Sequence, residues 1–451
     1  MVRRWDLGEW ARRRPVVRNA LALALTGGVA RLFDAGYRVV VARLIGPETV
    51  GLLQMAGSVY GFAFGLATLG LSPAVARLVA AGRPVHQVAT TARALVGPSG
   101  LVSALLLAVA APWLAHHVLS DPRVVLPLRV LALGLIPASC CGVLRGRFQG
   151  LQRMTPLAWA QVLEPAIRLG ATLGALVALP ALWPLPVPLP PAALLAALGV
   201  LGEGTECLFL AGWTVRDQAT QTTAPSPSGS FSPAVAGQLL RLGIPLMLSQ
   251  FLLSTAAVAD ASLTPRLLAL SGLSAPDATR EYGRLHGMVL PFLFFPMTLV
   301  FPLGAVLIPG VAEARAARDY RRLRRRLTQA VAGAVAVEAA AALLYLLVPD
   351  RLASLVGGGP AVTALIRGLA IWVPFAYLDY IGSSALIGFG ATQSALANGL
   401  LNAAVRLGLS YLLVPHPAMR LKGALLALAA GDAVATGAHF LRLTRWIKVR
   451  R

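Results

Sequence analysis

The feature that most constrains this chain is a succession of long apolar segments. About twelve segments of roughly 20 residues or more, rich in Leu, Ala, Val and Gly, follow one another along its 451 residues. A run of about 20 apolar residues is long enough to cross a hydrocarbon layer about 30 Å thick as a helix. Only 13% of the residues are charged, about half the share in a soluble domain. The chain is therefore predicted to be an all-α polytopic membrane protein with about 12 transmembrane helices.

The apolar segments fall into two sets of six, which predicts two six-helix lobes. A polar stretch at 220–232 separates the sets, and its Ser, Thr and Pro content is typical of a flexible linker. The predicted parts are a basic N-terminus at 1–18, an N-terminal lobe at 19–213, a linker at 214–236, a C-terminal lobe at 237–443 and a tail at 444–451. The predicted spans are 19–42, 48–71, 92–115, 124–144, 154–180, 191–213, 237–263, 284–309, 327–349, 361–387, 394–415 and 421–443.

The basic residues indicate how the spans are oriented. Nearly all of the 40 basic residues are arginines, and they gather in alternate loops and at both ends of the chain, for example in the run at 315–326. Such an enrichment is typical of cytoplasmic loops. Both termini and the linker are therefore expected to be cytoplasmic, and we attribute the net charge of +22 to this topology rather than to a nucleic-acid partner. No small-residue cleavage site follows the first apolar segment, so we expect that segment to remain as the first span.

The first predicted span contains three ionisable residues. Arg31, Asp34 and Arg38 are spaced i, i+3 and i+7, which places them on one face of a helix. An ionised side chain at mid-bilayer costs about 2.5–3.5 kcal/mol on insertion scales, and such residues usually face a bundle interior or a water-filled cavity. Two cations and one anion leave an excess of positive charge, which favours a cavity that takes an anion. The alternative is that Asp34 only neutralises Arg31 or Arg38.

Other spans also carry polar residues. The fifth span has Gln161, Glu164 and Arg168 on one face. Glu164 and Arg168 also have a structural interpretation, an ion pair within the helix that braces the bundle. Polar side chains in several spans of one chain predict a polar central cavity between two lobes. The remaining candidates are Gln250 and Asp260 in the seventh span, Asp379 in the tenth and Asn402 in the eleventh.

The sequence lacks the motifs of the common enzyme and metal-site classes. It has no H-E-x-x-H, no G-x-S-x-G, no P-loop and no strand-linked G-x-G-x-x-G pattern. No external loop is long enough to hold a catalytic domain. The cysteines Cys140, Cys141 and Cys207 lie within apolar spans, where they are best interpreted as small hydrophobic fillers. We therefore expect neither catalysis nor a cofactor nor a metal site.

Several stretches of the chain resemble a known family. The segment GGVARLFDAGYRVVVARLIGPETVGLLQMAGSVYGFAFGLATLGLSPAVARLVA, at 27–80, is similar to the N-terminal signature of the stage V sporulation protein B family. Further similarity lies in RGRFQGLQRMTPLAWAQVLEPAIRL at 145–169, REYGRLHGMVLPFLFFP at 280–296 and LIPGVAEA at 307–314. The members of this family are polysaccharide-biosynthesis membrane proteins of the multidrug/oligosaccharidyl-lipid/polysaccharide (MOP) exporter superfamily.

The resemblance implies a two-lobe helical bundle that exports lipid-linked saccharides across the bacterial cytoplasmic membrane. One branch of the superfamily translocates lipid II, a peptidoglycan precursor of the cell wall, and cationic residues of its first helix line the cavity. The A-R-L…A-R-L-I-G-P pattern carries this role onto Arg31, with Arg38 close by, and Arg284 in YGRL matches an arginine of the eighth helix. Proteins of that branch commonly have more spans than are predicted here.

These observations lead to one hypothesis, an alternating-access flippase for a polyprenyl-pyrophosphate-linked saccharide. Arg31 and Arg38 would bind the pyrophosphate, because guanidinium groups form strong and often bidentate hydrogen bonds with phosphate oxygens. The amide side chains of Gln161, Gln250 and Asn402 would bind sugar hydroxyl groups. The polyprenyl tail would stay in the lipid phase, and the flippase would work as a monomer.

Two alternative functions remain open. One is a cation-coupled multidrug exporter of the same superfamily, in which Asp34, Asp260 or Asp379 takes a Na+ or H+ ion. Such an ion, or the membrane potential, is also a candidate to drive a flippase. The other alternative is a membrane scaffold for cell-wall synthesis enzymes. Anionic membrane lipids are a further expected partner of the basic run at 315–326, for which plain positive-inside topology is the alternative explanation.

Overall fold

The computed structural model describes residues 15–178, 190–219 and 231–448, and within these ranges it is helical, with no strand. This finding confirms the predicted all-α class. The chain up to residue 14, residues 179–189, residues 220–230 of the predicted linker and the last three residues lie outside the described residues.

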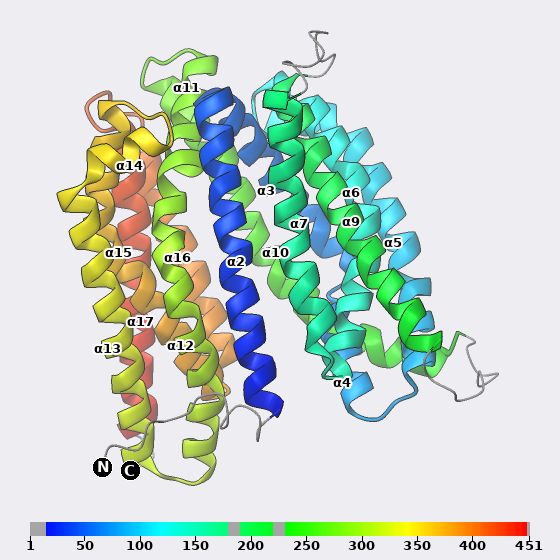
Figure 1. Ribbon diagram of the computed structural model, residues 1–451. Helices are drawn as coiled ribbons and strands as arrows, with labels where there is room; N and C mark the ends of the chain where they lie inside the picture. Colours follow the sequence, from blue (N-terminus) through cyan, green and yellow to red (C-terminus); the bar gives the residue numbers. More distant parts are fainter. Residues whose placement is uncertain (1–14, 179–189, 220–230, 449–451) are drawn as a thin grey trace, which may run out of the picture. The chain divides into compact units, whose positions relative to one another are not determined.

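The helices follow the predicted spans, and each span overlaps one long helix (Figure 1). In the first half of the chain they are α2 (Pro15–Ile45), α3 (Pro47–Thr68), α4 (Leu71–Ala80), α5 (Val85–Trp113), η1 (Leu114–Val118), η2 (Pro122–Val124), α6 (Val125–Gly150), α7 (Met154–Leu173), η3 (Gly174–Ala178) and α9 (Pro191–Ala219). In the second half they are α10 (Pro233–Leu270), α11 (Ala275–Gly283), η4 (Arg284–Val289), α12 (Leu290–Ala316), α13 (Tyr320–Leu347), α14 (Pro349–Leu355), α15 (Pro360–Gly388), α16 (Thr392–Leu413) and α17 (Arg420–Lys448).

Most of these helices can cross a membrane. The described residues contain 10 helical segments that are long and apolar enough to do so. Two more helices, α2 with 31 residues and α7 with 20, are also long enough, although charged residues interrupt their apolar pattern. Together they agree with the prediction of about twelve spans. The chain is therefore a multi-pass membrane protein.

The contacts among the helices divide the described residues into two compact units. Unit 1 comprises the residues up to Tyr37, Val59–Ala111 and Val125–Phe251, and unit 2 comprises Arg38–Ser58, Pro112–Val124 and the residues from Leu252 onward. The division falls inside α2, α3, α5 and α10, and it assigns the tip of the α5–α6 hairpin to unit 2. The lobe limits of 19–213 and 237–443, which follow from chain order, stay a prediction.

In unit 1, small residues let the helices approach closely. α6 packs against α4 and α9, and α7 packs against α9. Gly146 and Gly150 of α6 lie on α4. A Cβ atom at Gly146 would lie 2.4 Å from the carbonyl oxygen of Ser72, and one at Gly150 would lie 2.6 Å from Cβ of Val79. Larger side chains here would push α4 away from α6, so these glycines permit the close backbone packing that is typical of helices in membranes.

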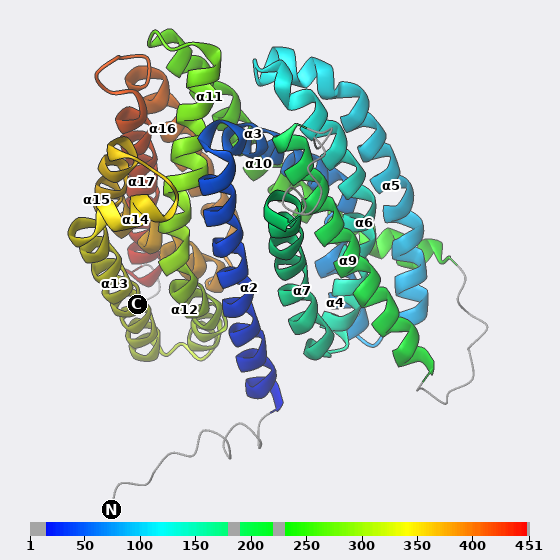
Figure 2. The ribbon, with the colours of Figure 1, turned by 45° about the horizontal axis from the view of Figure 1, so that its top comes forward.

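In unit 2, α12 packs against α13 and α15, and α15 packs against α17, as both ribbon views show (Figures 1 and 2). α12 continues as one helix through Pro296, Pro302 and Pro309, although each proline removes a backbone hydrogen bond. Pro296 has no N–H for the carbonyl oxygen of Phe292, and the hydroxyl of Tyr345 on α13 donates to that oxygen at 2.5 Å. A neighbouring helix thus supplies the hydrogen bond that the proline removes, which is how membrane spans tolerate proline.

A polar network attaches the tip of the α5–α6 hairpin to the rest of unit 2. Asp121 is 3% exposed and accepts hydrogen bonds from the hydroxyl of Thr279 at 2.9 Å and from the guanidinium of Arg123 at 2.7 Å. Arg123 and Arg280 also pair with Glu48 at the start of α3. Burial acts to raise the pKa of Asp121, but the hydrogen bonds from Arg123 and Thr279 outweigh burial and hold the pKa below its ordinary value. The carboxylate therefore stays ionised at neutral pH.

Candidate functional site

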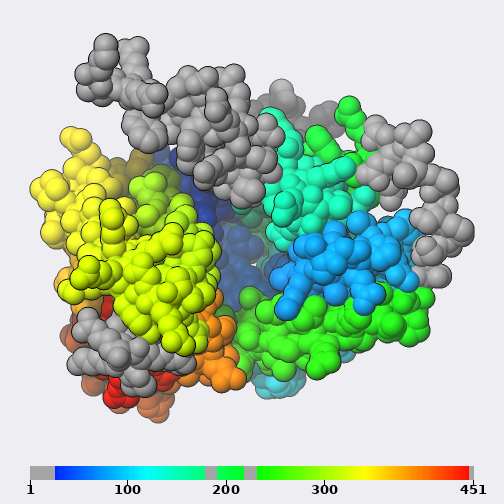
Figure 3. Space-filling model, turned by 90° about the horizontal axis from the view of Figure 1, so that it is seen from below, coloured from blue at the N-terminus to red at the C-terminus, as the bar shows by residue number. Residues whose placement is uncertain are grey.

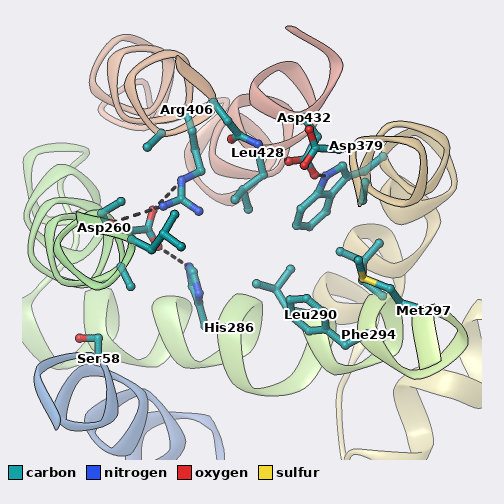
Figure 4. A pocket seen from close by; sticks show the side chains of 18 of the residues that line it. Ser58, Asp260, His286, Leu290, Phe294, Met297, Asp379, Arg406, Leu428 and Asp432 are labelled. Atoms are coloured by element: carbon teal, nitrogen blue, oxygen red, sulfur yellow. Dashed lines mark hydrogen bonds and ion pairs between the residues drawn. The ribbon is translucent and has the colours of Figure 1, made fainter. Parts of the chain in front are cut away.

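A cavity of about 770 Å³ lies among the helices of unit 2, and we refer to it as the unit 2 pocket (Figure 4). All of its lining residues belong to unit 2. Three carboxylates, two guanidinium groups and one imidazole face this space. The volume lies within the usual range of ligand sites, roughly 300–1,000 Å³. The charged and amide side chains of the lining are Arg38, Gln54, Asp260, His286, Asp379, Asn402, Arg406 and Asp432.

One side of the pocket is a cluster of ionisable groups from three helices. Nε2 of His286 on η4 lies 3.2 Å from Oδ2 of Asp260 on α10, and Nε of Arg406 on α16 lies 4.0 Å from Oδ1 of the same carboxylate (Figure 4). The ring of Tyr282 stacks on His286, with the ring centroids 4.3 Å apart. Gln54 of α3 donates to the backbone oxygen of His286 at 3.0 Å. Asp260 is 5% exposed, so these partners replace polar contacts with water that burial removes.

Across the pocket lie Asp379 of α15 and Asp432 of α17 (Figure 4). Asp432 accepts hydrogen bonds from Nε1 of Trp372 at 2.5 Å and from Nδ2 of Asn402 at 2.6 Å. Oδ1 of Asp379 lies 3.2 Å from Nε2 of His439, a buried residue of α17. Indole and amide donors leave the charge of a carboxylate in place, and an imidazole can carry a proton. This side of the pocket therefore presents two carboxylates that contact side chains of neighbouring helices.

The remaining wall of the pocket is apolar. Leu290, Phe294 and Met297 of α12 and Leu428 of α17 face the charged groups (Figure 4). A cavity that combines charged groups with an apolar wall can hold an amphipathic ligand. Across the residues that the structure describes, no group of three or more His, Cys, Asp and Glu side chains is arranged to hold a metal ion.

Unit 1 has a charged cluster of its own, formed by α2 and α7. Arg168 of α7 donates to Oδ1 of Asp34 on α2 and lies 3.3 Å from Oε1 of Glu164, one turn earlier on its own helix. Its guanidinium also lies over the ring of Tyr37, 4.6 Å from the centroid. The pair within α7 forms as its spacing predicts. Asp34, in contrast, pairs with a residue 134 positions further along the chain.

Helix α9 adds two more carboxylates to unit 1. Glu206 is 3% exposed and pairs with Arg145 of α6, whose Nε lies 2.8 Å from Oε1. Glu203 accepts a hydrogen bond from the hydroxyl of Tyr60 on α3 at 2.5 Å. Gly134 of α6 makes room for this second pair, since a Cβ atom there would lie 3.0 Å from Oε2 of Glu203. These carboxylates of unit 1 are therefore engaged in close contacts between helices.

The residues predicted to bind substrate are distributed over both units. Arg38 and Asn402 line the unit 2 pocket, whereas Arg31, Gln161 and Gln250 belong to unit 1. Gln161 and Gln250 are exposed, and the two arginines are partly buried. The pocket has three carboxylates against two guanidinium groups, so it does not show the positive excess expected from the first span. The roles of these five residues stay predictions.

The other predicted residues also fall in different places. Asp260 and Asp379, two of the candidate coupling carboxylates, face the unit 2 pocket, and the third, Asp34, lies in unit 1. Arg284 pairs with Glu281, three residues earlier, and lies outside the lining of the pocket. Unit 2 therefore contains two of the candidate coupling groups in one cavity.

Several residues in or beside the pocket escape prediction from sequence, among them His286, Trp372, Asp432 and His439. Asp432 is detectable in principle, because a carboxylate in an apolar span is itself a signal of function. The histidines and the tryptophan give no such signal, since these residue types are common in buried and interfacial positions. Only the packing of the helices shows that each of them contacts an aspartate.

Comparison with known proteins finds a family and curated relatives. Residues 16–314 match the family model described as polysaccharide biosynthesis protein. The chain is 27% identical over 447 residues to stage V sporulation protein B of Bacillus subtilis, across 96% of this chain and 84% of that protein. It is 22% identical over 353 residues to the lipid II flippase MurJ of the same organism, across 74% of this chain and 63% of that protein.

The fold also has solved counterparts. The chain superposes on the inward-facing conformation of a multidrug resistance MATE family transporter of the MOP superfamily with a TM-score of 0.71. The sequence identity is 17%, and the superposition covers 93% of this chain and 95% of the transporter. This similarity concerns the fold alone, and it confirms the predicted MOP-type helical bundle.

Proposed function

We propose a function that starts from one finding: this chain belongs to the polysaccharide biosynthesis protein family. We infer that it is a flippase, which moves a polyprenyl-pyrophosphate-linked saccharide across the bacterial cytoplasmic membrane by alternating access. One relative is named a lipid II flippase, and the transporter fold supports transport rather than catalysis. A lipid II-like peptidoglycan precursor is the first candidate substrate.

The unit 2 pocket carries this proposal, because it joins charged groups to an apolar wall in one cavity. Arg38 and Arg406 offer guanidinium donors for phosphate oxygens, and Asn402 offers an amide for a sugar hydroxyl group. The wall around Phe294 and Met297 can lie along the first isoprene units of the tail. The polar contacts thus match the pyrophosphate and saccharide headgroup, and the apolar contacts match the start of the polyprenyl tail.

Residues of unit 1 are proposed as further ligands of the substrate. Arg31 is assigned to the anionic headgroup, and Gln161 and Gln250 are assigned to sugar hydroxyl groups. All three lie in long apolar helices and are at least partly exposed at the surface of the protein. Their contributions are separable from that of the pocket by single substitutions.

A coupling cation, Na+ or H+, is proposed to bind at the acidic groups of the unit 2 pocket. Asp260, Asp379 and Asp432 outnumber Arg38 and Arg406, so a bound cation would balance the charge of the cavity. The same excess of carboxylates supports a second candidate function, a cation-coupled exporter of cationic drugs. The two candidates differ in the charge of the transported molecule, and transport assays can therefore separate them.

Transport by the full chain in proteoliposomes tests the flippase proposal. The probe is a fluorescent lipid II analogue, and a membrane-impermeant quencher reports how much of it has crossed. We expect the wild-type chain to move the analogue and Arg38→Gln to slow it about tenfold or more, because a bidentate phosphate contact is lost. Arg367→Gln is the matched control, since Arg367 is an exposed arginine of unit 2 outside the pocket.

Other outcomes would favour the other functions. If the wild-type chain exports a cationic dye and leaves the lipid analogue in place, it is an exporter. If it moves neither and still binds wall-synthesis enzymes, the scaffold alternative holds. Unchanged translocation in both Arg31→Gln and Arg38→Gln would remove the proposed phosphate ligands.

The orientation in the membrane is also part of the proposal. Both termini and the α12–α13 connection are assigned to the cytoplasm, and the chain is assigned to work as a monomer. A cysteine introduced at Arg324 should react with a membrane-impermeant thiol reagent only in inverted vesicles. One at Arg351 should react only in right-side-out vesicles, because both positions are exposed, Arg324 lies near the start of α13 and Arg351 lies in α14, just after the end of α13. The reverse labelling pattern would contradict this topology.

A further inference from the structure

A second cavity, of about 520 Å³, lies between α12 and α13 in unit 2, and we refer to it as the α12–α13 groove. Its walls are mainly apolar, with Leu303 and Val306 on α12 and Ala330 on α13. Glu313 and Arg326 line its other end. The groove shares no lining residue with the unit 2 pocket, so the proposed transport does not account for it.

The shape of the groove follows from small residues and prolines. Gly310 and Gly333 bring the two helices together. A Cβ atom at Gly310 would lie 2.8 Å from Nη1 of Arg326, and one at Gly333 would lie 2.9 Å from Cδ1 of Leu303. Pro302 and Pro309 of α12 also line the cavity, and their short rings leave space that longer side chains would fill.

The length of the groove matches one leaflet of a bilayer. It runs along α12 from Glu313 to Pro302, a distance of about 16 Å along a helix axis. The hydrocarbon of one leaflet is about 15 Å deep, half of a core about 30 Å thick. Val306 is 73% exposed and Leu299, further along the same helix, is 65% exposed, so protein leaves this face of α12 uncovered. In a membrane, acyl chains cover such a face.

The Glu313 end of the groove has an excess of positive charge. Arg326 donates to the carbonyl oxygen of Gly310 at 2.6 Å and to Oε2 of Glu313 at 3.1 Å, and Arg322 lies 3.5 Å from the same carboxylate oxygen. Two guanidinium groups thus share one carboxylate. The α12–α13 connection, in yellow-green, lies on the side of the molecule from which Figure 3 is viewed. Further exposed arginines lie in this connection, at Arg318, and in the first turns of α13, at Arg321, Arg324 and Arg325.

We propose that the α12–α13 groove binds an anionic glycerophospholipid of the surrounding leaflet. One acyl chain lies against Val306 and Ala330, and the lipid phosphate accepts hydrogen bonds from Arg322 and Arg326. These guanidinium groups have more N–H donors than the single carboxylate of Glu313 can occupy. A zwitterionic lipid offers the same chain without the net negative charge, so charge complementarity selects the anionic lipid. This inference does not depend on which substrate crosses the membrane.

Native mass spectrometry of the full, delipidated chain in detergent tests the site. The probes are phosphatidylglycerol and phosphatidylcholine with identical acyl chains. We expect the wild type to retain phosphatidylglycerol in preference. Arg322→Gln should weaken this binding about fivefold, the factor expected for the loss of one arginine beside an anionic lipid. Arg367→Gln, which makes the same change at an exposed ion pair elsewhere in unit 2, should leave the binding unchanged.

Two further substitutions probe the carboxylate and the apolar wall separately. Glu313→Gln removes the carboxylate that competes for the two guanidinium groups, so it should strengthen phosphatidylglycerol binding. Val306→Trp fills the groove and should abolish retention of the lipid. Leu299→Trp is its matched control, since Leu299 is a similarly exposed residue two turns away on α12 and outside the groove. All of these side chains are exposed, so the variants should fold.

Several results would overturn the proposal. Equal retention of the two phospholipids would remove the selectivity, and unchanged binding in both Arg322→Gln and Val306→Trp would remove the site. Displacement of bound phosphatidylglycerol by an equimolar amount of undecaprenyl phosphate would assign the groove to a polyprenyl tail instead. These assays measure lipid binding and the earlier assay measures translocation, so failure of one proposal is distinguishable from failure of the other.

Discussion

The charged groups of unit 1 and unit 2 are arranged differently. In unit 1, Arg168 pairs with Asp34 and Arg145 pairs with Glu206, in close contacts that join helices. In unit 2, Asp260 has an imidazole at 3.2 Å and a guanidinium at 4.0 Å, and it faces a cavity of about 770 Å³. The same residue types thus connect helices in unit 1, whereas in unit 2 several of them also line a cavity.

This difference has a physical basis. An ion within a membrane protein is stable only with a counter-charge or with water. A buried close pair meets this requirement permanently, so the loss of one partner leaves an uncompensated charge. A charge at a cavity can exchange its partner for a ligand or an ion. Substitutions in the close ion pairs of unit 1 should therefore act mainly on stability, and those in the unit 2 pocket mainly on transport.

The largest effect is expected from a buried pair of unit 1. Asp217 pairs with Arg153 and with Arg147, which is 6% exposed. Asp217→Ala leaves Arg147 buried without this counter-charge, and we expect the free energy of unfolding to fall by about 3–5 kcal/mol. Thermal unfolding in detergent measures the change. Glu313→Ala, at an exposed ion pair of unit 2, is the control and should cost less than about 1 kcal/mol. Equal stability of Asp217→Ala and the wild type would contradict a bracing role for the pairs of unit 1.

A smaller effect on stability, with a clear effect on transport, is expected at the pocket. Asp260→Asn keeps the shape of the side chain and removes its charge. We expect translocation in proteoliposomes to slow about tenfold or more, which corresponds to about 1.4 kcal/mol, with little change in the unfolding temperature. Asp277→Asn makes the same change at an exposed residue of unit 2 and should behave like the wild type. Parallel losses of stability and transport would place Asp260 with the bracing charges of unit 1.

The smallest effect is expected at the tip of the α5–α6 hairpin. The pKa of Asp121 is lower in the folded chain than its ordinary value, so this carboxylate stabilises the fold at pH values above about 3.9, and the contribution is lost as the pH falls through the folded pKa. Asp121→Asn should cost about 1 kcal/mol at neutral pH, and the difference from the wild type should shrink below about pH 4. Unfolding measured at both pH values, with the exposed Asp350→Asn as control, checks this. A difference that does not vary with pH would mean that the charge of Asp121 contributes nothing.

Contacts within one helix were predictable from the sequence, and contacts between helices were not. The Glu164–Arg168 pair follows from a spacing of four residues in a helix. The Asp34–Arg168 pair joins residues 134 positions apart, and no local pattern indicates it. Asp432 illustrates an intermediate case. Its place in an apolar span was visible, but its donors Trp372 and Asn402 come from α15 and α16.

The sequence by itself determined that this chain is a multi-pass helical membrane protein with about twelve spans, because the free energy of placing a segment in a membrane depends on that segment's own composition. Only the tertiary structure decided which helix faces meet. Arg31 and Arg38 share one face of α2, yet they belong to different units. Which partner an ionised side chain receives depends on the packing of helices from distant parts of the chain, and that packing placed Asp260, His286 and Arg406 around one cavity.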